Sequence, residues 1–323
     1  MKRKIALVCA AAMALSLAAC GNTASTTSDS TASDSTASES TASESSATAE
    51  AAGEEAAASD FDNTQAITVI TREEGSGTRG AFIELTGVEE KNDAGEKVDN
   101  TSAGAATQNS TNGVMTTVAN DETAIGYISL GSLNDTVKAV TVGGVAASAD
   151  TVKDGTYTLA RPFNIVTNGD ATDPVAVDFI NYCMSTDGQA LATEDGYIGS
   201  DDAAAFESTQ PSGSITVGGS SSVSPLMEKL IEAYEGVNPN ASIELLTTDS
   251  TVGVSGALDG TYTIGMASRE LKDSEVEAGA KATVLAMDGI AVVVNPANPI
   301  EDLTIDQIKS IYTGETTTWD AIQ

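Results

Sequence analysis

The sequence has 323 residues, more than one ordinary domain requires, and its 47 acidic and 15 basic residues give a formal net charge of −32. Such a surface disfavours nucleic acid and anionic lipid headgroups as partners. Histidine is absent, which excludes Ser-His-Asp and Cys-His pairs and His-ligated zinc. Carboxylate-based catalysis is the one enzymatic route left open, and we predict no enzyme, no cofactor and no metal site.

Residues 1–19 have the pattern of a signal peptide: a basic head, a short apolar run and small residues before Cys20. Leu17 to Cys20 also resembles a bacterial lipobox, which implies a diacylglyceryl group on the Cys20 sulfur and a protein anchored on the extracellular face of the cell membrane. Plain secretion, with Cys20 incidental, is the alternative. Loss of Lys2, Arg3 and Lys4 with the signal would take the formal charge to −35.

Residues 20–60 are predicted to be the lipidated cysteine and a disordered tether. From residue 22 onward the segment consists of Ser, Thr, Ala and acidic near-repeats without Lys, Arg or aromatic residues, so it cannot bury a core. Of the three cysteines, Cys9 leaves with the signal and Cys20 takes the lipid. Cys183 therefore remains alone, which excludes a disulfide framework and suits a small core residue.

The first motif of the folded part is a strand, a tight turn and a helix start. Residues 67–70 are β-branched, residues 71–79 read Thr-Arg-Glu-Glu-Gly-Ser-Gly-Thr-Arg, and residues 80–85 predict a short helix. Small residues at 75–78 let the backbone approach a ligand, and the free N–H groups of a first helical turn favour an anion. The same turn could instead only cap the helix with a hydroxyl.

The chain then continues with alternating elements. After an ambiguous polar stretch at 86–110, the apolar patterns predict helices and strands with a Pro- and Gly-containing linker at their end. The expected elements are a helix at 113–119, strands at 124–130, 137–142 and 157–167, the last with Pro162 at a bend or edge, a helix from Pro174 to about Ala192, and a linker at 200–213.

Two further copies of strand, turn and helix follow. Residues 215–217, 218–222 and 225–234 form one, and residues 243–246, 249–251 and 253–258 form the other. The remaining patterns predict a short strand at 262–269, a buried strand at 284–294 and an amphipathic helix at 305–312 that ends at Gly314.

Strands that alternate with helices indicate an α/β fold with mainly parallel sheets. In such sheets a ligand lies outside the carboxyl ends of the strands. Three hydroxyl-rich helix starts at those ends, together with Arg72, therefore predict an oxyanion site. Each hydroxyl taken alone could be only an N-cap.

Four motifs together resemble the phosphate-binding lipoproteins that serve ABC importers. They are Gly218-Gly-Ser-Ser-Ser-Val-Ser-Pro-Leu226, Ile264-Gly-Met-Ala-Ser-Arg-Glu-Leu271, Asp288-Gly-Ile-Ala-Val-Val-Val-Asn295 and Arg72-Glu-Glu-Gly-Ser-Gly-Thr-Arg79. The resemblance covers about residues 64–323. It implies a two-lobed type II periplasmic-binding-protein fold with an interlobe cleft, inorganic phosphate as ligand, an ABC permease as partner, and a monomer.

The motifs stand in an unusual order, because the family has the Gly-Ser-Ser-Ser segment first. The chain therefore resembles a circularly permuted member, with residues 201–213 joining the family's usual termini and new ends between Trp319 and Ile67. One lobe would be 158–292, and the other would combine 61–157 with 293–323. An excerpt of a longer tandem protein is the competing explanation.

By motif, the resemblance carries the family's anion-binding role to residues of three segments. Best-known members hold an acid where Ser268 stands, which leaves Glu74 as the acceptor that would discriminate phosphate from sulfate, because only phosphate keeps a proton to donate. Arg79 and Arg269 could instead be structural ion-pair partners. The expected ligands are Arg72, Glu74, Ser76, Gly77, Thr78, Ser221, Ser222, Ser250, Thr251 and Ser268.

Two other functions stay open at this point. The site could take another oxyanion, such as sulfate or molybdate, if Glu74 lies away from it. The chain could also be a surface interaction lipoprotein that no longer binds an ion.

Overall fold

The structure is a computed structural model that describes residues 61–322. The predicted signal peptide, the lipidation at Cys20 and the tether lie outside these residues. Among residues 61–322, every helix is too short or too polar to span a lipid bilayer.

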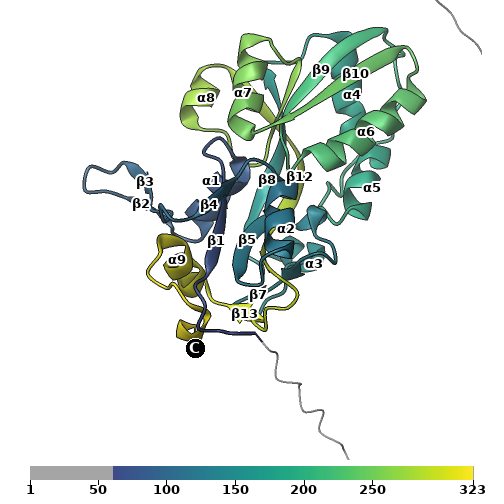
Figure 1. The fold of residues 1–323 in the computed structure, drawn as a ribbon. Helices are drawn as coiled ribbons and strands as arrows, with labels where there is room; N and C mark the ends of the chain where they lie inside the picture. The colour runs from purple at the N-terminus through teal and green to yellow at the C-terminus, as the bar shows by residue number, and fades with distance from the viewer. Residues whose placement is uncertain (1–60, 323) are drawn as a thin grey trace, which may run out of the picture. The chain divides into compact units, whose positions relative to one another are not determined.

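Two strands run through the middle of the molecule and connect its two halves (Figure 1). They are β8 (Ala160–Asn168) and β12 (Ala280–Val294), which pair antiparallel. β12 is long enough to pair with β8 over its first part and with β5 (Ala124–Ser129) over its last part. The main sheet therefore continues from one half to the other in the order β10-β9-β11-β8-β12-β5-β1-β4, with the short β6 (Lys138–Ala139) also on β12.

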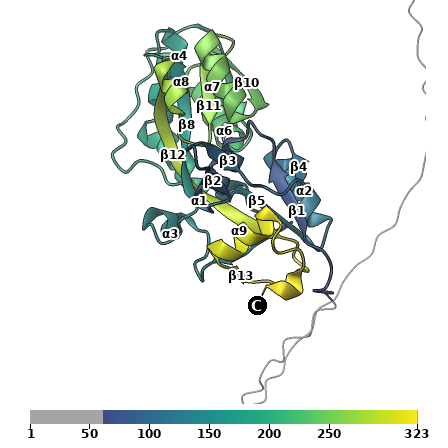
Figure 2. The same ribbon diagram turned by 90° about the vertical axis from the view of Figure 1, so that its left-hand side faces the viewer.

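The first half is built on three parallel strands. β9 (Gly213–Ser220) pairs with β10 (Ala241–Thr248) and with β11 (Ile264–Ala267), and helices cover both faces (Figure 2). Its core gathers the apolar face of α6 against the sheet and α4, with Leu226, Leu230 and Tyr234 all fully buried. The helices of this half are α4 (Pro174–Cys183), α5 (Thr186–Glu194), α6 (Ser224–Val237), α7 (Ser250–Asp259) and α8 (Asp273–Glu277).

The second half has its own parallel strands and its own core. β1 (Thr68–Arg72) pairs with β5 and with β4 (Ala106–Gln108). Phe82 stacks on Tyr127 with ring centroids 3.9 Å apart, and Tyr312 packs edge-on against Phe82. Its helices are α1 (Gly77–Leu85), α2 (Thr111–Ala119), α3 (Ala149–Lys153) and α9 (Ile305–Thr313), and β7 (Thr141–Val142) pairs with β13 (Asp302–Leu303).

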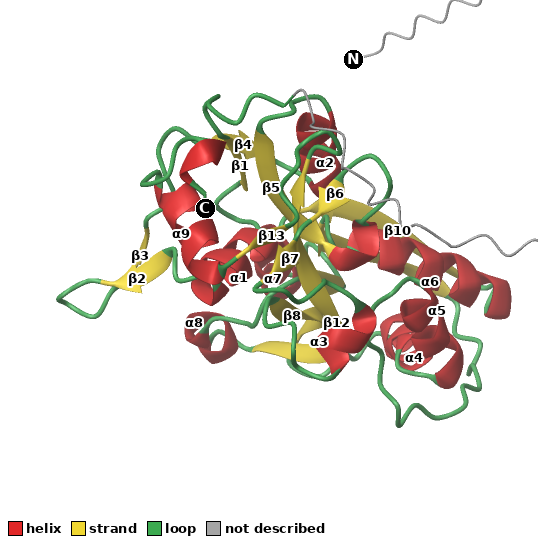
Figure 3. Cartoon of the chain, turned by 90° about the horizontal axis from the view of Figure 1, so that it is seen from below, coloured by secondary structure: helices red, strands yellow, loops and turns green. Residues whose placement is uncertain are grey.

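A hairpin of β2 (Glu89–Lys91) and β3 (Lys97–Asp99) projects from the second half, away from the rest of the molecule (Figure 3). Most of its residues are exposed. In sequence it belongs to the polar stretch at 86–110 that gave no clear prediction.

Several predicted elements differ from the structure. The helix expected from Pro174 to about Ala192 is two helices, because Ser185 caps α5 through Gly188 N–H and its hydroxyl donates to the Tyr182 carbonyl. The strand expected at 137–142 divides into β6 and β7, which pair with different partners.

Pro162 was expected at a bend or a sheet edge, but β8 is an inner strand. The proline is tolerated because β11 pairs only with Asn164 to Val166 of β8. On that side Pro162 therefore has no strand to which an N–H would have to donate.

The two ends of the described chain lie side by side. Ile67 N donates to the Thr317 carbonyl over 2.8 Å, Ala66 bridges to Thr318, and Asp320 N donates to the Asn63 carbonyl. A circularly permuted order requires this adjacency, since the new ends must open within a connection that otherwise joins them.

Candidate functional site

The turn between β1 and α1 is placed as the sequence predicted. Ser76 caps α1, accepting from Arg79 N over 3.3 Å, and the helix begins at Gly77, three residues earlier than expected. Glycine is required at 77 because a Cβ there would lie 2.3 Å from Ser250 Oγ and 2.8 Å from Ser268 Oγ. The backbone of this turn thus approaches the first turn of α7 as closely as atoms allow.

The second turn, between β9 and α6, meets the first across the middle of the molecule. Arg72 Nη2 donates to Ser221 Oγ over 3.1 Å, and the hydroxyls of Thr78 and Ser222 are 2.8 Å apart. Ser222 does not cap α6: the cap position is Val223, which provides no side-chain bond. The Ser222 hydroxyl instead bonds to the Thr78 hydroxyl and, over 3.2 Å, to the hydroxyl of Thr111 at the start of α2.

The third turn closes the same group. Ser250 opens α7 behind the N-cap Asp249, and its Oγ accepts from Ser268 N over 3.0 Å. Ser268, at the end of β11, bonds through its own hydroxyl to Ser220 over 2.9 Å and to Ser250 over 3.3 Å. We call the buried hydroxyls that these turns bring together, with Arg72, the hydroxyl cluster: Thr78, Ser220, Ser221, Ser222, Ser250 and Ser268.

Two predicted ligands lie at the rim of this cluster. Thr251 is exposed and donates to the Gly75 carbonyl through both its N–H and its hydroxyl, each over 3.2 Å. Glu74 is exposed as well, and its carboxylate enters none of the ion pairs formed within residues 61–322. The acid that turns to Arg72 is the neighbouring Glu73.

Arg72 carries the charge of the cluster. It is 2 % exposed, and its guanidinium forms a fork with the Glu73 carboxylate, with Nε–Oε2 of 2.8 Å and Nη2–Oε1 of 2.7 Å. Arg79 donates to the Arg72 carbonyl over 2.6 Å and pairs with Asp99. Arg269 pairs with Glu275. The ion-pair roles considered for Arg79 and Arg269 are therefore confirmed.

The sequence did not single out two hydroxyls of the site. Ser220 bonds to Ser268, and Thr111 bonds to Ser222. Signals for both existed: Ser220 is the first of three consecutive serines, and Ser110-Thr111 precede an apolar helical pattern. The expected helix began at 113, two residues after its true start, and so left Thr111 in a loop.

A buried ion pair beside the cluster was also missed. Arg161 of β8 and Asp288 of β12 pair with Nη2–Oδ2 of 3.0 Å, and Arg161 Nη1 donates to the Ser268 carbonyl over 3.1 Å. Burial raises the pKa of the Asp288 carboxyl and lowers the pKa of Arg161, to which nearby Arg72 also contributes.

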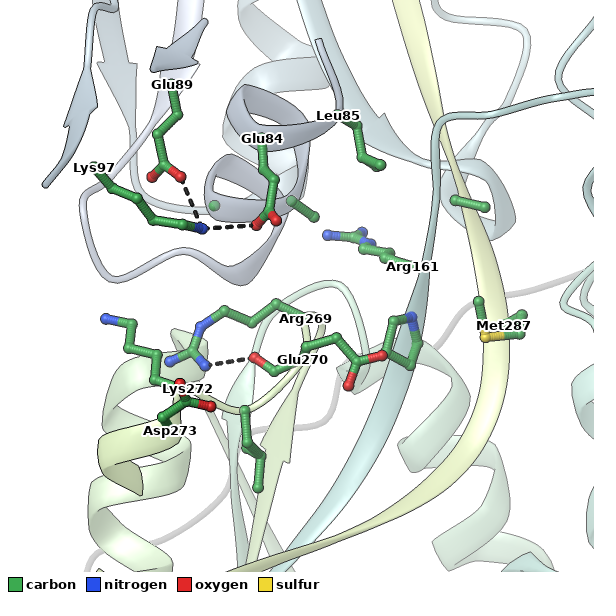
Figure 4. Close-up of a pocket in the computed structure, with 15 residues that line it drawn as sticks. Glu84, Leu85, Glu89, Lys97, Arg161, Arg269, Glu270, Lys272, Asp273 and Met287 are labelled. Atoms are coloured by element: carbon green, nitrogen blue, oxygen red, sulfur yellow. Dashed lines mark hydrogen bonds and ion pairs between the residues drawn. The ribbon is translucent and has the colours of Figure 1, made fainter. Parts of the chain in front are cut away.

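A cavity of about 640 Å³ lies on the side of Arg161 away from the hydroxyl cluster, and residues from the middle and the end of α1 line it (Figure 4). One lip belongs to α1 and the hairpin, where Lys97 pairs with Glu84 and Glu89. The other lip belongs to the loop after β11. The wall between them is formed by β8 and β12, and the second lip contributes Arg269, Glu270, Leu271, Lys272 and Asp273.

A smaller cavity of about 200 Å³ adjoins the cluster at Ser221 and Thr111. Within residues 61–322, no group of three or more Cys, Asp or Glu side chains is arranged to hold a metal ion. The chemistry of the cluster is therefore that of short hydroxyl donors, free helix-start N–H groups and one guanidinium, a set that suits a small oxyanion.

Comparison with known proteins agrees with this chemistry. The model of the PBP superfamily domain matches residues 26–187 and 204–322. The phosphate-binding protein PstS 2 of Streptococcus agalactiae serotype V is 51% identical over 253 residues, 78% of this chain and 86% of that protein. The crystal structure of a phosphate ABC transporter, phosphate-binding protein from Streptococcus pneumoniae TIGR4 is 43% identical, with a TM-score of 0.65, and the match covers 80% of this chain and 100% of that chain.

The extent of the match differs from one relative to another. The alignment to the S. agalactiae protein runs through most of both chains, so the two have the same order. The phosphate-binding protein PstS of Bacillus subtilis is 34% identical over only 111 residues, 33% of this chain and 37% of that protein. A partial match of this kind is expected where the order differs. From the superfamily match and the extended similarity to the streptococcal proteins, the chain belongs to the PBP superfamily and, within it, to the phosphate-binding proteins PstS.

Proposed function

We propose that this chain captures inorganic phosphate outside the cytoplasm and delivers it to an ABC importer. The observation that carries the proposal is the convergence of three separated turns on one cluster of buried hydroxyls around Arg72. The names of the relatives at 43–51% identity support phosphate as the ion and an ABC transporter as the partner. On this proposal the chain is a binding protein and has no catalytic role.

The hydroxyls that now bond to one another across the cluster would each turn toward the oxygens of the ion. Arg72 would supply charge-assisted hydrogen bonds, which are about twice as strong as neutral ones. The N–H groups at the start of α1 would add donors and the positive end of the helix dipole. The proposed ligands are Arg72, Ser76, Gly77, Thr78, Ser221, Ser222, Ser250 and Ser268, with Thr251 and Glu74 at the rim.

We further propose that two lobes, 158–292 and 61–157 with 293–323, close on the ion by bending β8 and β12. Two observations support this division. These two strands carry the main sheet from one half to the other, and the hydroxyl cluster draws residues from both halves. Closure would exclude water from the ion and strengthen its hydrogen bonds to the protein.

The anchoring proposal rests on the sequence of residues 1–60. Signal cleavage before Cys20, a lipid on its sulfur and a tether over residues 20–60 would place the binding unit, as a monomer, on the extracellular face of the membrane. A Cys20→Ser variant should then appear in the culture medium, whereas the unsubstituted chain stays with the membrane fraction. Equal membrane association of both would refute the lipid anchor.

Isothermal titration tests the binding function. The chain without residues 1–19 and with Cys20→Ser is titrated separately with phosphate, sulfate and molybdate. We expect saturable binding of phosphate with one site and at least tenfold weaker binding of the other two. No binding of phosphate, or equal binding of phosphate and sulfate, would refute the proposal.

A second candidate function is the capture of another oxyanion. The exposure of Glu74 favours it, because that carboxylate was expected to accept the proton that phosphate has and sulfate lacks. Tighter binding of sulfate or molybdate than of phosphate in the same titration would establish this alternative.

A further inference from the structure

A buried chain of hydrogen bonds crosses from one half of the molecule to the other directly beside the hydroxyl cluster. It begins at Ser129 of β5, whose hydroxyl donates to Asp288 Oδ1 over 2.9 Å. Asp288 Oδ2 accepts from Arg161 Nε over 3.3 Å and from Nη2 over 3.0 Å. Arg161 Nη1 donates to the Ser268 carbonyl over 3.1 Å. All four residues are at most 2 % exposed.

Stability alone gives a weak reason for this arrangement. Moving two charges out of water carries a desolvation penalty that their mutual attraction only partly offsets, and well-packed apolar side chains at such positions are often as stable or more so. The best-attested use of a buried ion pair is to fix a geometry. The feature that the Arg161 guanidinium fixes is the carbonyl of Ser268.

Ser268 joins the hydroxyls of two turns. Its Oγ lies 2.9 Å from Ser220 Oγ and 3.3 Å from Ser250 Oγ, and its N–H donates to Ser250 Oγ over 3.0 Å. The position of the Ser268 backbone therefore sets where the β9–α6 turn and the start of α7 lie relative to each other. Arg161 reaches that backbone from β8, a strand that both halves share.

We propose that Arg161 is a positioning residue of the anion site, oriented by Asp288 and acting through Ser268. The inference rests on the proposed phosphate function, because its readout is phosphate affinity. The planar guanidinium holds the Asp288 carboxylate with two N–H groups and the Ser268 carbonyl with a third in a fixed geometry, which the flexible ammonium of lysine does not reproduce. The long side chain of Arg161 does not need to touch the ion.

A double-mutant cycle by isothermal titration with phosphate tests the proposal. Arg161→Lys should weaken phosphate binding about tenfold. That is the lower end of the loss of affinity at metal sites when a residue that orients a metal ligand is substituted. Ser268→Ala should also weaken phosphate binding. If Arg161 acts by placing the Ser268 hydroxyl, the double variant should bind within about twofold of Ser268→Ala alone, because coupled residues are not additive.

Two further variants separate positioning from folding. Arg161→Met with Asp288→Asn removes both charges of the buried pair and should remain folded, yet bind phosphate at least as weakly as Arg161→Lys. Asp178→Asn is the matched control: Asp178 is a buried carboxylate of α4 that accepts from Ser208, Thr209 and Tyr234, none of them a residue of the cluster. It should lower the melting temperature and leave phosphate affinity unchanged.

The outcomes are distinguishable from failure of the proposed function. If the parent chain does not bind phosphate, the proposed function is refuted before any variant is compared. If the parent binds but Arg161→Lys binds equally well, or if the effects of Arg161→Lys and Ser268→Ala multiply in the double variant, the positioning role is refuted. A loss of affinity in Asp178→Asn equal to that in Arg161→Lys would also refute it.

Discussion

The two sides of Arg161 differ in how the halves of the molecule meet. On the cluster side, hydrogen bonds between uncharged hydroxyls and one guanidinium cross from half to half, as between Thr78 and Ser222. On the cavity side, each ion pair stays on its own lip, as Lys97 with Glu84 and Arg269 with Glu275. Within residues 61–322, no ion pair bridges the cavity.

The two sides differ in which contacts between protein side chains an entering ligand would have to replace. Short hydroxyls can each exchange one neutral partner for an anion oxygen, with little side-chain entropy to lose. Charged lips would have to exchange ion pairs, and they gain nothing from a small anion that their acidic members repel. We therefore expect substitutions on the cluster side to change phosphate affinity and those on the cavity side to leave it unchanged.

The largest expected effect is that of Arg72→Ala. The variant removes the one charge of the cluster and the bond to Ser221, so we expect phosphate binding to weaken about 10- to 100-fold in isothermal titration. Lys97→Met removes a cation from the cavity side and should bind normally. Equal effects of the two substitutions would remove the distinction between the sides, and normal affinity in Arg72→Ala would place the anion elsewhere.

Gly77→Ala should come next. Its Cβ would lie 2.3 Å from Ser250 Oγ, so the β1–α1 turn must withdraw from α7, and we expect about tenfold weaker phosphate binding and a lower melting temperature. Gly80→Ala is the control on the same helix, because its Cβ would meet only Arg269 Cδ at 3.7 Å. Alanine there should bind normally and stabilise the helix slightly. Normal phosphate binding by Gly77→Ala would show that this close approach is not part of the site.

Thr78→Val should have a smaller effect. Valine keeps the shape of threonine but loses the hydroxyl that bonds to Ser222 over 2.8 Å, so phosphate affinity should fall several-fold, in line with about 1 kcal/mol for one hydrogen bond. Thr86→Val at the other end of α1 also loses a buried hydroxyl, but one that donates only to the Phe82 carbonyl. Thr86→Val should lower the melting temperature and leave phosphate affinity unchanged. A similar loss of affinity in both would point to helix packing rather than the site.

Glu74→Gln should have the smallest effect. The carboxylate is exposed at the rim, so we expect the ratio of phosphate to sulfate affinity to change less than about twofold. A collapse of that ratio would show instead that Glu74 turns inward when the ion binds and accepts its proton, the role that the family resemblance implies.

The alternation of strands and helices, and the meeting of three turns, could be predicted from the sequence. Parallel strands bring their carboxyl ends to one edge, so the hydroxyl-rich turns after β9 and β10 had to be neighbours. β1 lies in the other half and runs opposite to β9, so its turn meets theirs from the other side. The C-terminal end of α9 could also be predicted, because Gly314 adopts the left-handed conformation that ends a helix.

Other features had no local signal. Arg161 and Asp288 are 127 positions apart, and only the antiparallel pairing of β8 with β12 makes them partners. Which of the adjacent acids, Glu73 or Glu74, faces Arg72 depends on the backbone conformation of the turn that follows β1. The break between α4 and α5 was hidden because the apolar pattern continues through it while Ser185 supplies a new cap.

Segment 201–213 was expected to be a linker that joins the family's usual termini, and side-chain contacts hold it against the first half. Phe206 packs edge-on against Tyr182, and the carboxylate of Asp178 holds the backbone and hydroxyl of Thr209. Cleavage of the chain there would disrupt packing against the core of the first half. We therefore expect this stretch to resist proteases in the native protein despite its loop-like composition.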